Sequence, residues 1–560
     1  MTDRPMTTSL RQSLTQAIAV ARDAAFAAGD LPAGDGATPP AIHVERPARP
    51  EHGDYATNVA LQLAPVVRRA PMQIAETLRR HLGTPTGVAE TSVAAPGFIN
   101  LKLDPSWVAG QVTAILEAGP AFGLPTVPEP RKINVEFVSA NPTGPLTVGN
   151  ARGAFVGDLL CRVLEGVGHQ VTREYYFNDF NAQVRNLGLS VQARRLGEPI
   201  PEDGYHGEYV AQLAEELPDE VWQAAGQPGA DAAEVLGRWA SERLRAGIEE
   251  SLANLGVRFD VWTTEGSIHD GGWVERGLAR LRKAGHIYEA DGATWFRATA
   301  FGDDKDRVVI RSNGAPTYFA SDIGYLDQKF SRGFDQLIYL WGEDHHGTVA
   351  RNRAAAVALG FDPDAVQWLL MAWVRFVRDG VEASMSKRSG EFVTLDELLE
   401  EIGSDAARWY FGSRAASTGI DFDIELAKRQ SAENPVYYVQ YAHARCSSIL
   451  RIAAERSTAP DASHTGELLH HPAEQALIRQ MLTMPDVVSD AAERRETHEL
   501  TKLCLEVAQL FSQFYRDCRV LSDDPAEANL SEARLALTDA VRQVLANMLG
   551  LMGIHAPESM

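Results

Sequence analysis

Apolar residues recur every three or four positions near the start of the chain and throughout its last quarter. This is the spacing of one helix face, and it predicts a helix over 10–28 and a helical bundle from 434 to the end. The two clearest apolar stripes of the bundle are Leu500, Leu503, Val507, Leu510 and Phe514, and Val541, Val544, Leu545, Met548 and Leu549. The C-terminal region is therefore expected to be all-α.

The middle of the chain follows a different pattern, in which strand-like and helical runs alternate. Residues 133–138 are typical of a strand, and a helix and the strand-like run HQVTREYYFND follow. The apolar face of that helix is Phe155, Leu159, Val163 and Val167. The order strand–turn–helix–strand predicts a parallel, doubly wound sheet. Strand-like runs return at 307–312 and 336–342, whereas 184–300 is predicted to be an insertion of mixed polar helices.

Three domains follow from these patterns. The segment 1–125 combines a helix with an alternating, edge-strand-like run at 91–103, which indicates a small α/β module. A proline-rich linker then leads into the sheet domain at 131–430, and the helical domain spans 434–560. Three or four domains are what a chain of 560 residues is expected to need, since one core would be too large.

Composition narrows the class of protein. The net charge of −22 argues against a general nucleic-acid binder, but a basic patch can still lie on an acidic body. The chain has no stretch of about 18 apolar residues and no apolar leader at its start, so we expect neither a membrane span nor secretion. Its four cysteines lack any C-x-x-C pair, which favours reduced thiols in the cytoplasm over a zinc ribbon.

The turn NPTGPLTVGNARGA at 141–154 is the first candidate for chemistry. It joins a strand to a helix, and the N-terminus of such a helix favours anions. Gly144 and Gly149 would let a ligand approach the backbone. Thr147 and Asn150 stand where a cationic or imidazole side chain is expected on a phosphate-binding turn. The alternative is a merely tight connection.

The loop SMSKRSGEFVTL at 384–395 is the second candidate. It carries Lys387 and Arg388 among small polar residues. A mobile basic loop can close over a polyphosphate and neutralise charge that develops during phosphoryl or adenylyl transfer. Taken alone, this stretch is equally typical of an ordinary surface loop that bears a lysine.

The stretch WGEDHHG at 341–347 could contact a substrate or a ribose. A metal site at Asp344, His345 and His346 is disfavoured, because adjacent residues rarely face one ion and no further ligand cluster supports it.

Two acidic residues suggest how an amino acid would bind. Glu136, at a strand end, could hold an ammonium group. Asp322, four residues after Tyr318, could pair bidentately with a guanidinium. As isolated acids, both would more often be solvated surface charges.

Together these residues resemble the arginyl-tRNA synthetases, a family of class I aminoacyl-tRNA synthetases. VEFVSANPTGPLTVGNARGAFVGD is similar to the first signature region of the family, and SMSKRSGEFVTL to the second. YFASDIGY and WGEDHHG resemble the segments between them. NPVYYVQYAHARCSSIL and the ending MGIHAPESM resemble the anticodon-binding domain, and HGDYATNVAL with AAPGFINLKL the added N-terminal, tRNA-binding domain. The resemblance covers nearly the whole chain in the right order.

The resemblance implies a Rossmann-type catalytic domain that makes arginyl-adenylate from arginine and ATP and passes arginine to the terminal ribose of tRNA(Arg). It also implies that adenylation needs bound tRNA, that Mg²⁺ accompanies ATP, and that the protein is a cytoplasmic monomer. No protein ligand for Mg²⁺ can be named.

The resemblance also implies roles for residues at matching positions. The α-amino group of arginine would bind Glu136 and Asn141 with Ser139 nearby, and its guanidinium would bind Tyr318 and Asp322. The catalytic set is Thr147, Gly149, Asn150, Lys387 and Arg388, and His346 joins the arginine site. The ATP site is Pro142, Gly144, Gly149, Asn150, Gly342, Asp344, His345, Met385, Ser386 and Lys387. Tyr441 and Arg445 are expected to contact tRNA.

The sequence departs from the family pattern at both signatures. The first usually reads H-x-G-H, and here Thr147 and Asn150 replace both histidines. The second usually opens K-M-S-K, and here Ser384 replaces the first lysine. A hydroxyl and an amide can still donate hydrogen bonds to phosphate, so the number of donors can be kept. Two alternatives stay open: a paralogue that transfers activated arginine to another acceptor, and a non-catalytic tRNA-binding protein.

Overall fold

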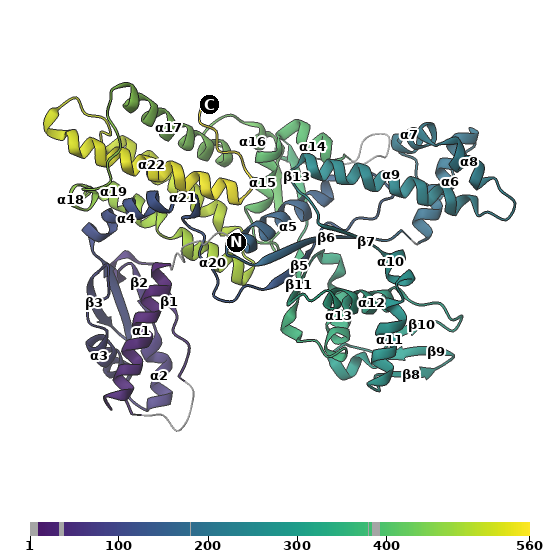
Figure 1. Cartoon of the computed structure of the whole chain (residues 1–560), viewed down its shortest axis with the longest axis horizontal. Coiled ribbons are helices and arrows are strands. Elements are labelled where there is room, and N and C mark those ends of the chain that lie inside the picture. The colour runs from purple at the N-terminus through teal and green to yellow at the C-terminus, as the bar shows by residue number, and fades with distance from the viewer. Residues whose placement is uncertain (1–8, 33–38, 180, 379, 384–392) are drawn as a thin grey trace.

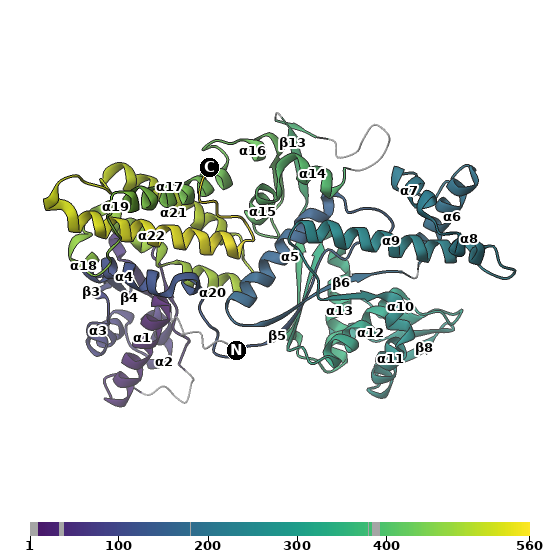
Figure 2. The same ribbon diagram turned by 45° about the horizontal axis from the view of Figure 1, so that its top comes forward.

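The computed structural model describes residues 9–32, 39–179, 181–378, 380–383 and 393–560 (Figure 1). Met385, Ser386, Lys387 and Arg388, predicted at the second signature, lie outside these residues. The chain forms an N-terminal α/β unit, a central sheet with helices on its faces, a helical arm and a C-terminal bundle. The bundle and the helical arm lie at opposite ends of the molecule in both ribbon views (Figures 1 and 2).

The N-terminal unit is a four-stranded antiparallel sheet covered by helices. Its strand order is β1-β2-β4-β3. Residues 91–103, predicted as one strand, instead form most of a hairpin, because Pro96 and Gly97 interrupt the ladder between its two arms. The elements are α1 (Leu10–Ala27), β1 (Val44–Glu45), β2 (Tyr55–Thr57), α2 (Val59–Val67), α3 (Pro71–Leu82), β3 (Val88–Ala94) and β4 (Phe98–Leu103).

The helix α4 (Pro105–Ala118) follows this unit and packs on helices of the C-terminal bundle. Ion pairs join the same two regions. Arg11 binds Asp490 with both Nη atoms at 2.8 Å, and Arg479 Nε lies 2.9 Å from Asp54 Oδ1. These contacts hold the N-terminal unit against the bundle.

The centre of the molecule is a five-stranded parallel sheet of order β12-β11-β5-β6-β7, which confirms the predicted doubly wound fold. The sheet and its flanking helices are β5 (Lys132–Glu136), α5 (Val148–Gly166), β6 (Gln170–Phe177), β7 (Val261–Thr264), α12 (Tyr318–Ser331), β11 (Gln336–Gly342), α13 (His346–Ala358) and β12 (Val366–Met371). Ile133 and Val135 on one face of β5 and Asn134 on the other are fully buried, as both faces of a central parallel strand require. The chain order reverses between β5 and β11, and such a crevice at the carboxyl ends of strands is where ligands bind.

The predicted helical insertion at 184–300 is only partly helical. Its first part forms the arm of α6 (Ala182–Leu196), α7 (Glu208–Glu216), α8 (Asp219–Ala225) and α9 (Ala232–Asn254). In the remainder, 265–270 and 273–283 are helical, but the prediction was wrong for three strands at 261–264, 287–290 and 293–296. The first of these, β7 (Val261–Thr264), is an edge strand of the central sheet. That strand has four residues, two of them threonines, so its sequence carries too few alternations to be distinguished from a loop.

A small antiparallel sheet of order β10-β9-β8 follows, so the predicted strand at 307–312 lies outside the central sheet. Its elements and the helices before it are α10 (Glu265–Asp270), α11 (Trp273–Lys283), β8 (Ile287–Ala290), β9 (Ala293–Phe296) and β10 (Arg307–Ile310). A third small sheet and three short helices lead to the bundle: β13 (Val374–Arg378), β14 (Val381–Glu382), α14 (Leu395–Ile402), α15 (Ser404–Gly412), β15 (Ile420–Asp423) and α16 (Ile424–Lys428).

The C-terminal region is the predicted all-α bundle. Both predicted stripes face its core, with Val507 and Val544 fully buried; Leu510 is the one stripe residue that is only half-buried. The helices are α17 (Pro435–Glu455), α18 (Thr465–Leu468), α19 (Pro472–Met481), α20 (Met484–Arg494), α21 (Glu499–Asp517) and α22 (Ala528–Leu551).

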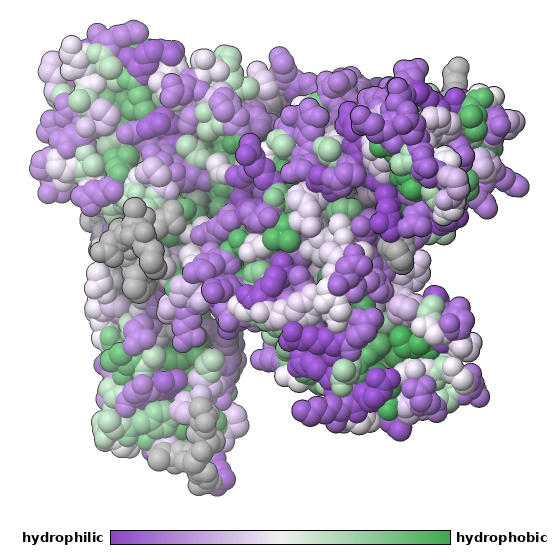
Figure 3. Space-filling view, turned by 45° about the vertical axis from the view of Figure 1, so that its right-hand side comes forward, coloured by the Kyte–Doolittle hydropathy of each residue, from purple (hydrophilic) through white to green (hydrophobic). Residues whose placement is uncertain are grey.

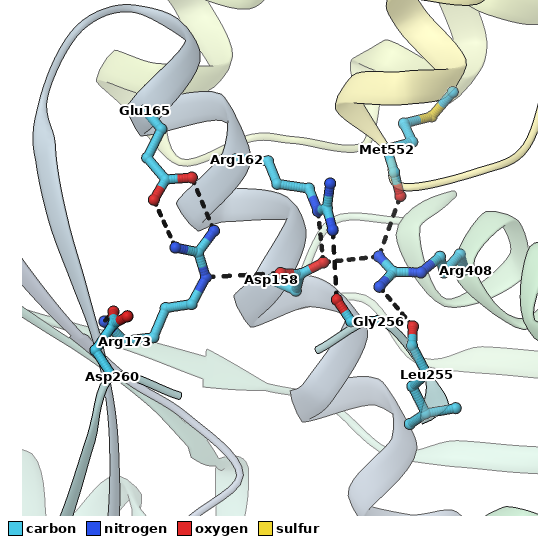
Figure 4. A network of polar contacts seen from close by, with 9 residues as sticks. All are labelled: Asp158, Arg162, Glu165, Arg173, Leu255, Gly256, Asp260, Arg408 and Met552. Atoms are coloured by element: carbon cyan, nitrogen blue, oxygen red, sulfur yellow. Dashed lines mark hydrogen bonds and ion pairs between the residues drawn. The ribbon is translucent and has the colours of Figure 1, made fainter. Parts of the chain in front are cut away.

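A buried polar network joins the bundle to the sheet domain (Figure 4). Arg408 of α15 donates from Nη1 to Asp158 Oδ2 of α5 at 2.8 Å and to the carbonyl of Met552, just after α22, at 3.2 Å. Its Nη2 donates to the carbonyl of Leu255, after α9, at 2.8 Å. Two of these partners are helix C-termini, whose partial negative charge stabilises a buried cation. One guanidinium thus ties four elements together.

The surface is mixed in polarity, with apolar side chains in small separate patches on the face shown in Figure 3. No helix in the described part of the chain combines the length and the apolar character that a bilayer crossing requires. The four cysteines are buried and unpaired.

Candidate active site

A pocket of about 870 Å³ opens at the carboxyl edge of the central sheet. Its walls come from the ends of β5, β11 and β12, the first turn of α5, and one face of α12. This is the crevice expected at the reversal of strand order. The predicted residues that line it are Glu136, Ser139, Asn141, Gly149, Asn150, Tyr318, Asp322, Gly342, Asp344 and His345.

Of the described residues predicted for catalysis or for binding arginine or ATP, four do not line the pocket. Pro142 is buried within the turn, and Gly144 lies against the hydroxyl of Tyr209. Thr147 precedes α5 and turns its side chain toward Asn150. His346 is exposed at the first residue of α13.

One stripe of α12 faces the pocket. Tyr318, Asp322, Tyr325 and Lys329 follow one another at spacings of four, three and four residues, which places them on one helix face. The first three line the pocket, and Lys329 lies behind them. Tyr318 is 61% exposed at the mouth, whereas the Lys329 side chain is fully buried at the far end. The stripe therefore runs from solvent to the interior and carries charges at two depths.

Glu136 and Lys329 form a buried ion pair at the inner end. Lys329 Nζ donates to Glu136 Oε2 at 2.6 Å and lies 4.4 and 4.2 Å from the ring centroids of Tyr325 and Tyr339. Ser139 Oγ donates to Glu136 Oε1 at 3.4 Å. An internal ammonium thus already pairs with this carboxylate, and its two oxygens have lone pairs left for a substrate ammonium.

Two further carboxyls make the pocket acidic. The pKa of Asp322 is raised to about 7, chiefly by burial and in smaller part by the charges of Glu265 and Glu136, while Arg351 and Asn352 oppose the shift. Burial also raises the pKa of Glu265. Glu265 Oε1 accepts a hydrogen bond from Ser321 at 3.0 Å, but buried Oε2 has no hydrogen-bond partner among the residues that the structure describes. Such an oxygen is costly to bury unless a ligand satisfies it.

The turn between β5 and α5, residues 137–147 (the β5–α5 turn), leads to the first turn of α5. The Thr147 hydroxyl and backbone N–H both donate to Asn150 Oδ1 at 3.1 Å. The Asn150 amide nitrogen has no hydrogen-bond acceptor within the described ranges, so its two N–H groups remain for a ligand. Of the two residues that replace histidines, Asn150 is therefore the donor, and Thr147 orients it.

Arg152 adds a buried positive charge beside this turn. Its guanidinium donates to the carbonyls of Ala372 at 2.7 Å and Ala415 at 2.8 Å. Burial lowers the pKa of Arg152 to about 10. Because no carboxylate neutralises it in the described structure, this cation favours an anion in the pocket.

Sequence reasoning missed Glu265, Arg152 and Arg351 as pocket residues. Arg152 lies only two residues after Asn150, and its place inside an otherwise apolar helix face was a usable signal. The sequence around Glu265 and Arg351 gave no such signal, since each residue reaches the pocket only through the packing of α10 and α13 against α12.

Far from the pocket, aromatic rings and a cation gather on the surface of the bundle. Arg445 Cζ lies 5.4 Å from the ring centroid of Tyr441 and 4.6 Å from that of Tyr515. Tyr437 stacks on Tyr441 with centroids 6.4 Å apart. Tyr441 and Tyr515 are 42% and 40% exposed. Exposed rings beside an arginine are suited to stacking on nucleobases.

In the described part of the chain, no three or more His, Cys, Asp or Glu side chains gather in a way that could hold a metal ion. Asp344 and His345, considered above as ligands, are exposed.

Three family models match successive parts of the chain. The arginyl tRNA synthetase N terminal domain matches residues 8–103, the catalytic domain of class I (R) tRNA synthetases matches 111–196 and 238–410, and the DALR anticodon binding domain matches 439–560.

Whole proteins match as well. The arginine–tRNA ligase of Moorella thermoacetica is 47% identical over 560 residues, covering 98% of each chain. That of Desulforudis audaxviator is 48% identical, covering 98% of this chain and 99% of the relative. The solved structure of Thermus thermophilus arginyl-tRNA synthetase superposes with a TM-score of 0.78 at 25% identity, over 98% of this chain and all of the other.

Proposed function

The chain belongs to the arginyl-tRNA synthetase family, and we propose that its central pocket carries out the reaction of that family. The enzyme activates arginine: the carboxylate of arginine attacks the α-phosphorus of ATP, and pyrophosphate leaves. It then transfers the arginyl group from the adenylate to the terminal ribose of tRNA(Arg) and releases AMP.

One observation carries the assignment of arginine to this pocket. Two desolvated carboxyls, Asp322 and Glu265, face the same cavity, and one oxygen of Glu265 has no partner within the described chain. A guanidinium presents five donors in a planar fork and suits two carboxylates better than an ammonium would. Tyr318, one turn of α12 from Asp322, closes the outer side of this guanidinium site.

The α-ammonium of arginine binds at the inner end of the pocket. Glu136 Oε1 and Asn141 Oδ1 accept hydrogen bonds from it, and Ser139 holds the Glu136 carboxylate in place. Lys329 holds that carboxylate in place through its hydrogen bond to Oε2. His346 is left outside the proposed arginine site, because it does not line the pocket.

ATP binds along the first turn of α5. Gly149 admits the nucleotide close to the backbone, and the Asn150 amide donates to a phosphate oxygen, with the helix N-terminus and Arg152 adding positive potential. Gly342, Asp344 and His345 contact the ribose. Catalysis is positioning and charge stabilisation, with no covalent enzyme intermediate.

Two groups of residues predicted for the ATP site do not line the pocket of the described structure. Pro142, Gly144 and Thr147 shape the β5–α5 turn and have no contact of their own with ATP. The roles proposed for Met385, Ser386, Lys387 and Arg388, which lie outside the described residues, rest on the resemblance of their loop to the second signature.

Mg²⁺ enters with ATP as part of the substrate. It usually keeps several waters and binds phosphate oxygens, so it needs few protein ligands. We also propose a monomer that acts in the cytoplasm; light scattering after size exclusion tests the first of these points.

The C-terminal bundle binds the tRNA. Tyr441 and Arg445, with Tyr515 beside them, form an exposed stacking surface for unpaired bases. The N-terminal unit, which ion pairs hold against α19 and α20, is a second region that contacts tRNA. The intact bundle also disfavours a paralogue that transfers arginine to a small acceptor, because such an enzyme would not need a tRNA-binding bundle.

Two measurements test the function: attachment of labelled arginine to tRNA(Arg), and arginine-dependent pyrophosphate exchange with and without tRNA. Charging is expected. Exchange without charging would instead indicate another acceptor, and silence in both assays would indicate a non-catalytic tRNA-binding protein.

A further inference from the structure

The β5–α5 turn holds a strained backbone at the edge of the pocket. Val138 and Ser139 have φ values of 65° and 45°, in the left-handed region that β-branched and other side chains rarely adopt. Both residues line the pocket. Strain of this kind persists only where surrounding contacts over-determine the conformation.

The sheet itself supplies the contacts for the first half of the turn. The backbone N–H of Tyr176 donates to Ser139 Oγ at 3.1 Å. The Tyr175 hydroxyl donates to the carbonyl of Ala140 at 2.8 Å. These partners lie on β6, directly beside β5.

The second half of the turn is held by the helical arm. The Tyr209 hydroxyl, on α7, donates to the carbonyl of Thr143 at 2.8 Å and lies against Gly144. Gln183 Oε1, in the first turn of α6, accepts a hydrogen bond from Asn141 Nδ2 at 2.8 Å. The backbone N–H of Asn178 donates to Asn141 Oδ1 at 3.3 Å. The amide of Asn141 is thus oriented from both sides.

The arm is rigid enough to serve as such a support. At the crossing of α6 and α9, a Cβ on Gly188 would lie 2.0 Å from the carbonyl oxygen of Ala233, and one on Gly237 would lie 2.2 Å from that of Val184. The two helix backbones therefore touch with no room for a side chain. At its other end α9 enters the main core through Leu252.

We infer that the helical arm positions the β5–α5 turn for catalysis, and that Tyr209 and Gln183 are its positioning residues. Neither contacts the reacting atoms. Tyr209 fixes the path of the turn toward α5, and Gln183 turns the Asn141 oxygen toward the α-ammonium of arginine. The inference rests on the proposed function of the pocket, and it gives the arm a role that its sequence did not suggest.

Tyr209→Phe removes one hydroxyl and keeps the ring. We expect the kcat of arginine-dependent pyrophosphate exchange, measured with saturating tRNA, to fall about tenfold, because small misplacements of reacting groups cost that much or more. The KM for ATP and the thermal midpoint are expected to stay unchanged. Tyr205→Phe is the matched control, since Tyr205 lies on the same arm and its hydroxyl makes no hydrogen bond within the described residues.

Gln183→Met removes the acceptor for Asn141 and is expected to raise the KM for arginine about threefold to tenfold, with the KM for ATP unchanged. Gln183→Glu keeps an acceptor and is expected to restore the KM. If both positions act on one turn, the effects of Tyr209→Phe and Gln183→Met will not add in the double variant.

Equal kinetics for Tyr209→Phe and Tyr205→Phe would overturn the inference. So would a loss of activity that follows a drop in thermal midpoint, since that is a structural effect alone. A wild-type protein that neither charges tRNA nor exchanges pyrophosphate would instead refute the proposed function, so the two failures are distinguishable.

Discussion

The affinity for arginine should depend on pH through Asp322. Burial holds the pKa of this carboxyl at about 7 in the pocket without arginine, above its ordinary value of 3.8. A bound guanidinium favours the charged form, so binding of arginine displaces the proton. The KM for arginine is therefore lowest above pH 7 and rises as the pH falls through 7.

The magnitude follows from the fraction of Asp322 that is protonated. With a pKa of about 7, about one tenth of the pockets carry the proton at pH 8 and about nine tenths at pH 6. The KM for arginine should then increase about tenfold between pH 8 and pH 6. Glu265, whose pKa is also raised, would steepen the rise.

The assay is arginine-dependent pyrophosphate exchange at pH 6, 7 and 8 with saturating ATP and tRNA. Asp322→Asn is the matched control, because it keeps the shape and removes the titration. Its KM for arginine should be nearly independent of pH, and its kcat/KM should be at least about 30-fold lower than that of the wild type, as for one partner lost from a buried charge pair.

Two results would refute the reasoning. One is a wild-type KM for arginine that changes less than twofold between pH 8 and pH 6. The other is an Asp322→Asn variant that keeps the wild-type pH dependence, since another group would then be responsible. A parallel change in the KM for ATP would place the titration at the nucleotide end of the pocket.

Three further predictions follow from the site and the fold. Asn150→Ala should lower the kcat of pyrophosphate exchange by about 10²–10³, as loss of a transition-state donor does. Thr147→Val should lower it by much less, since that hydroxyl only orients Asn150. Equal losses of kcat in the two variants would contradict this division of roles. Glu265→Gln should raise the KM for arginine at least about tenfold, because one carboxylate partner of the guanidinium is lost; exchange kinetics with an unchanged KM would remove Glu265 from the arginine site. Asp158→Asn should destabilise the junction of sheet domain and bundle by about 3–5 kcal/mol, because it leaves the cation of Arg408 buried without its carboxylate. Calorimetry would show this as a lower temperature of the first unfolding transition. An unchanged transition temperature would contradict the prediction.

Local patterns in the sequence were enough for the main architecture. The central parallel sheet was predicted from the order strand–turn–helix–strand. The C-terminal bundle was predicted because a period of 3.6 residues reflects which side of a helix is buried. Tyr318 and Asp322 were predicted as a pair from the chemistry of a guanidinium ligand and from the family resemblance, and the structure brings both to the pocket. The β7 strand was missed because four residues carry too little of any period.

The tertiary structure alone decided how these elements use their charges. Lys329 meets Glu136 across 193 positions of sequence, so an acid predicted for substrate has an internal partner. Glu265 and Arg351 reach the pocket only because α10 and α13 pack against α12. Thr147 and Asn150 looked like two equivalent donors, yet the Thr147 hydroxyl donates to Asn150 Oδ1, so only the Asn150 amide remains to donate to ATP.

The difference between what the sequence determined and what the tertiary structure decided has one physical reason. Sequence spacing is a local property, and it determined the first strands of the central sheet, the helix α5, the helices of the bundle and the faces that these helices bury. Which faces meet depends on contacts between distant residues. Desolvation, ion pairing and the raised pKa of Asp322 arise only after those contacts form. Many residues of the site could therefore be named from the sequence, whereas Glu265, Arg351 and the partners of the named residues could not.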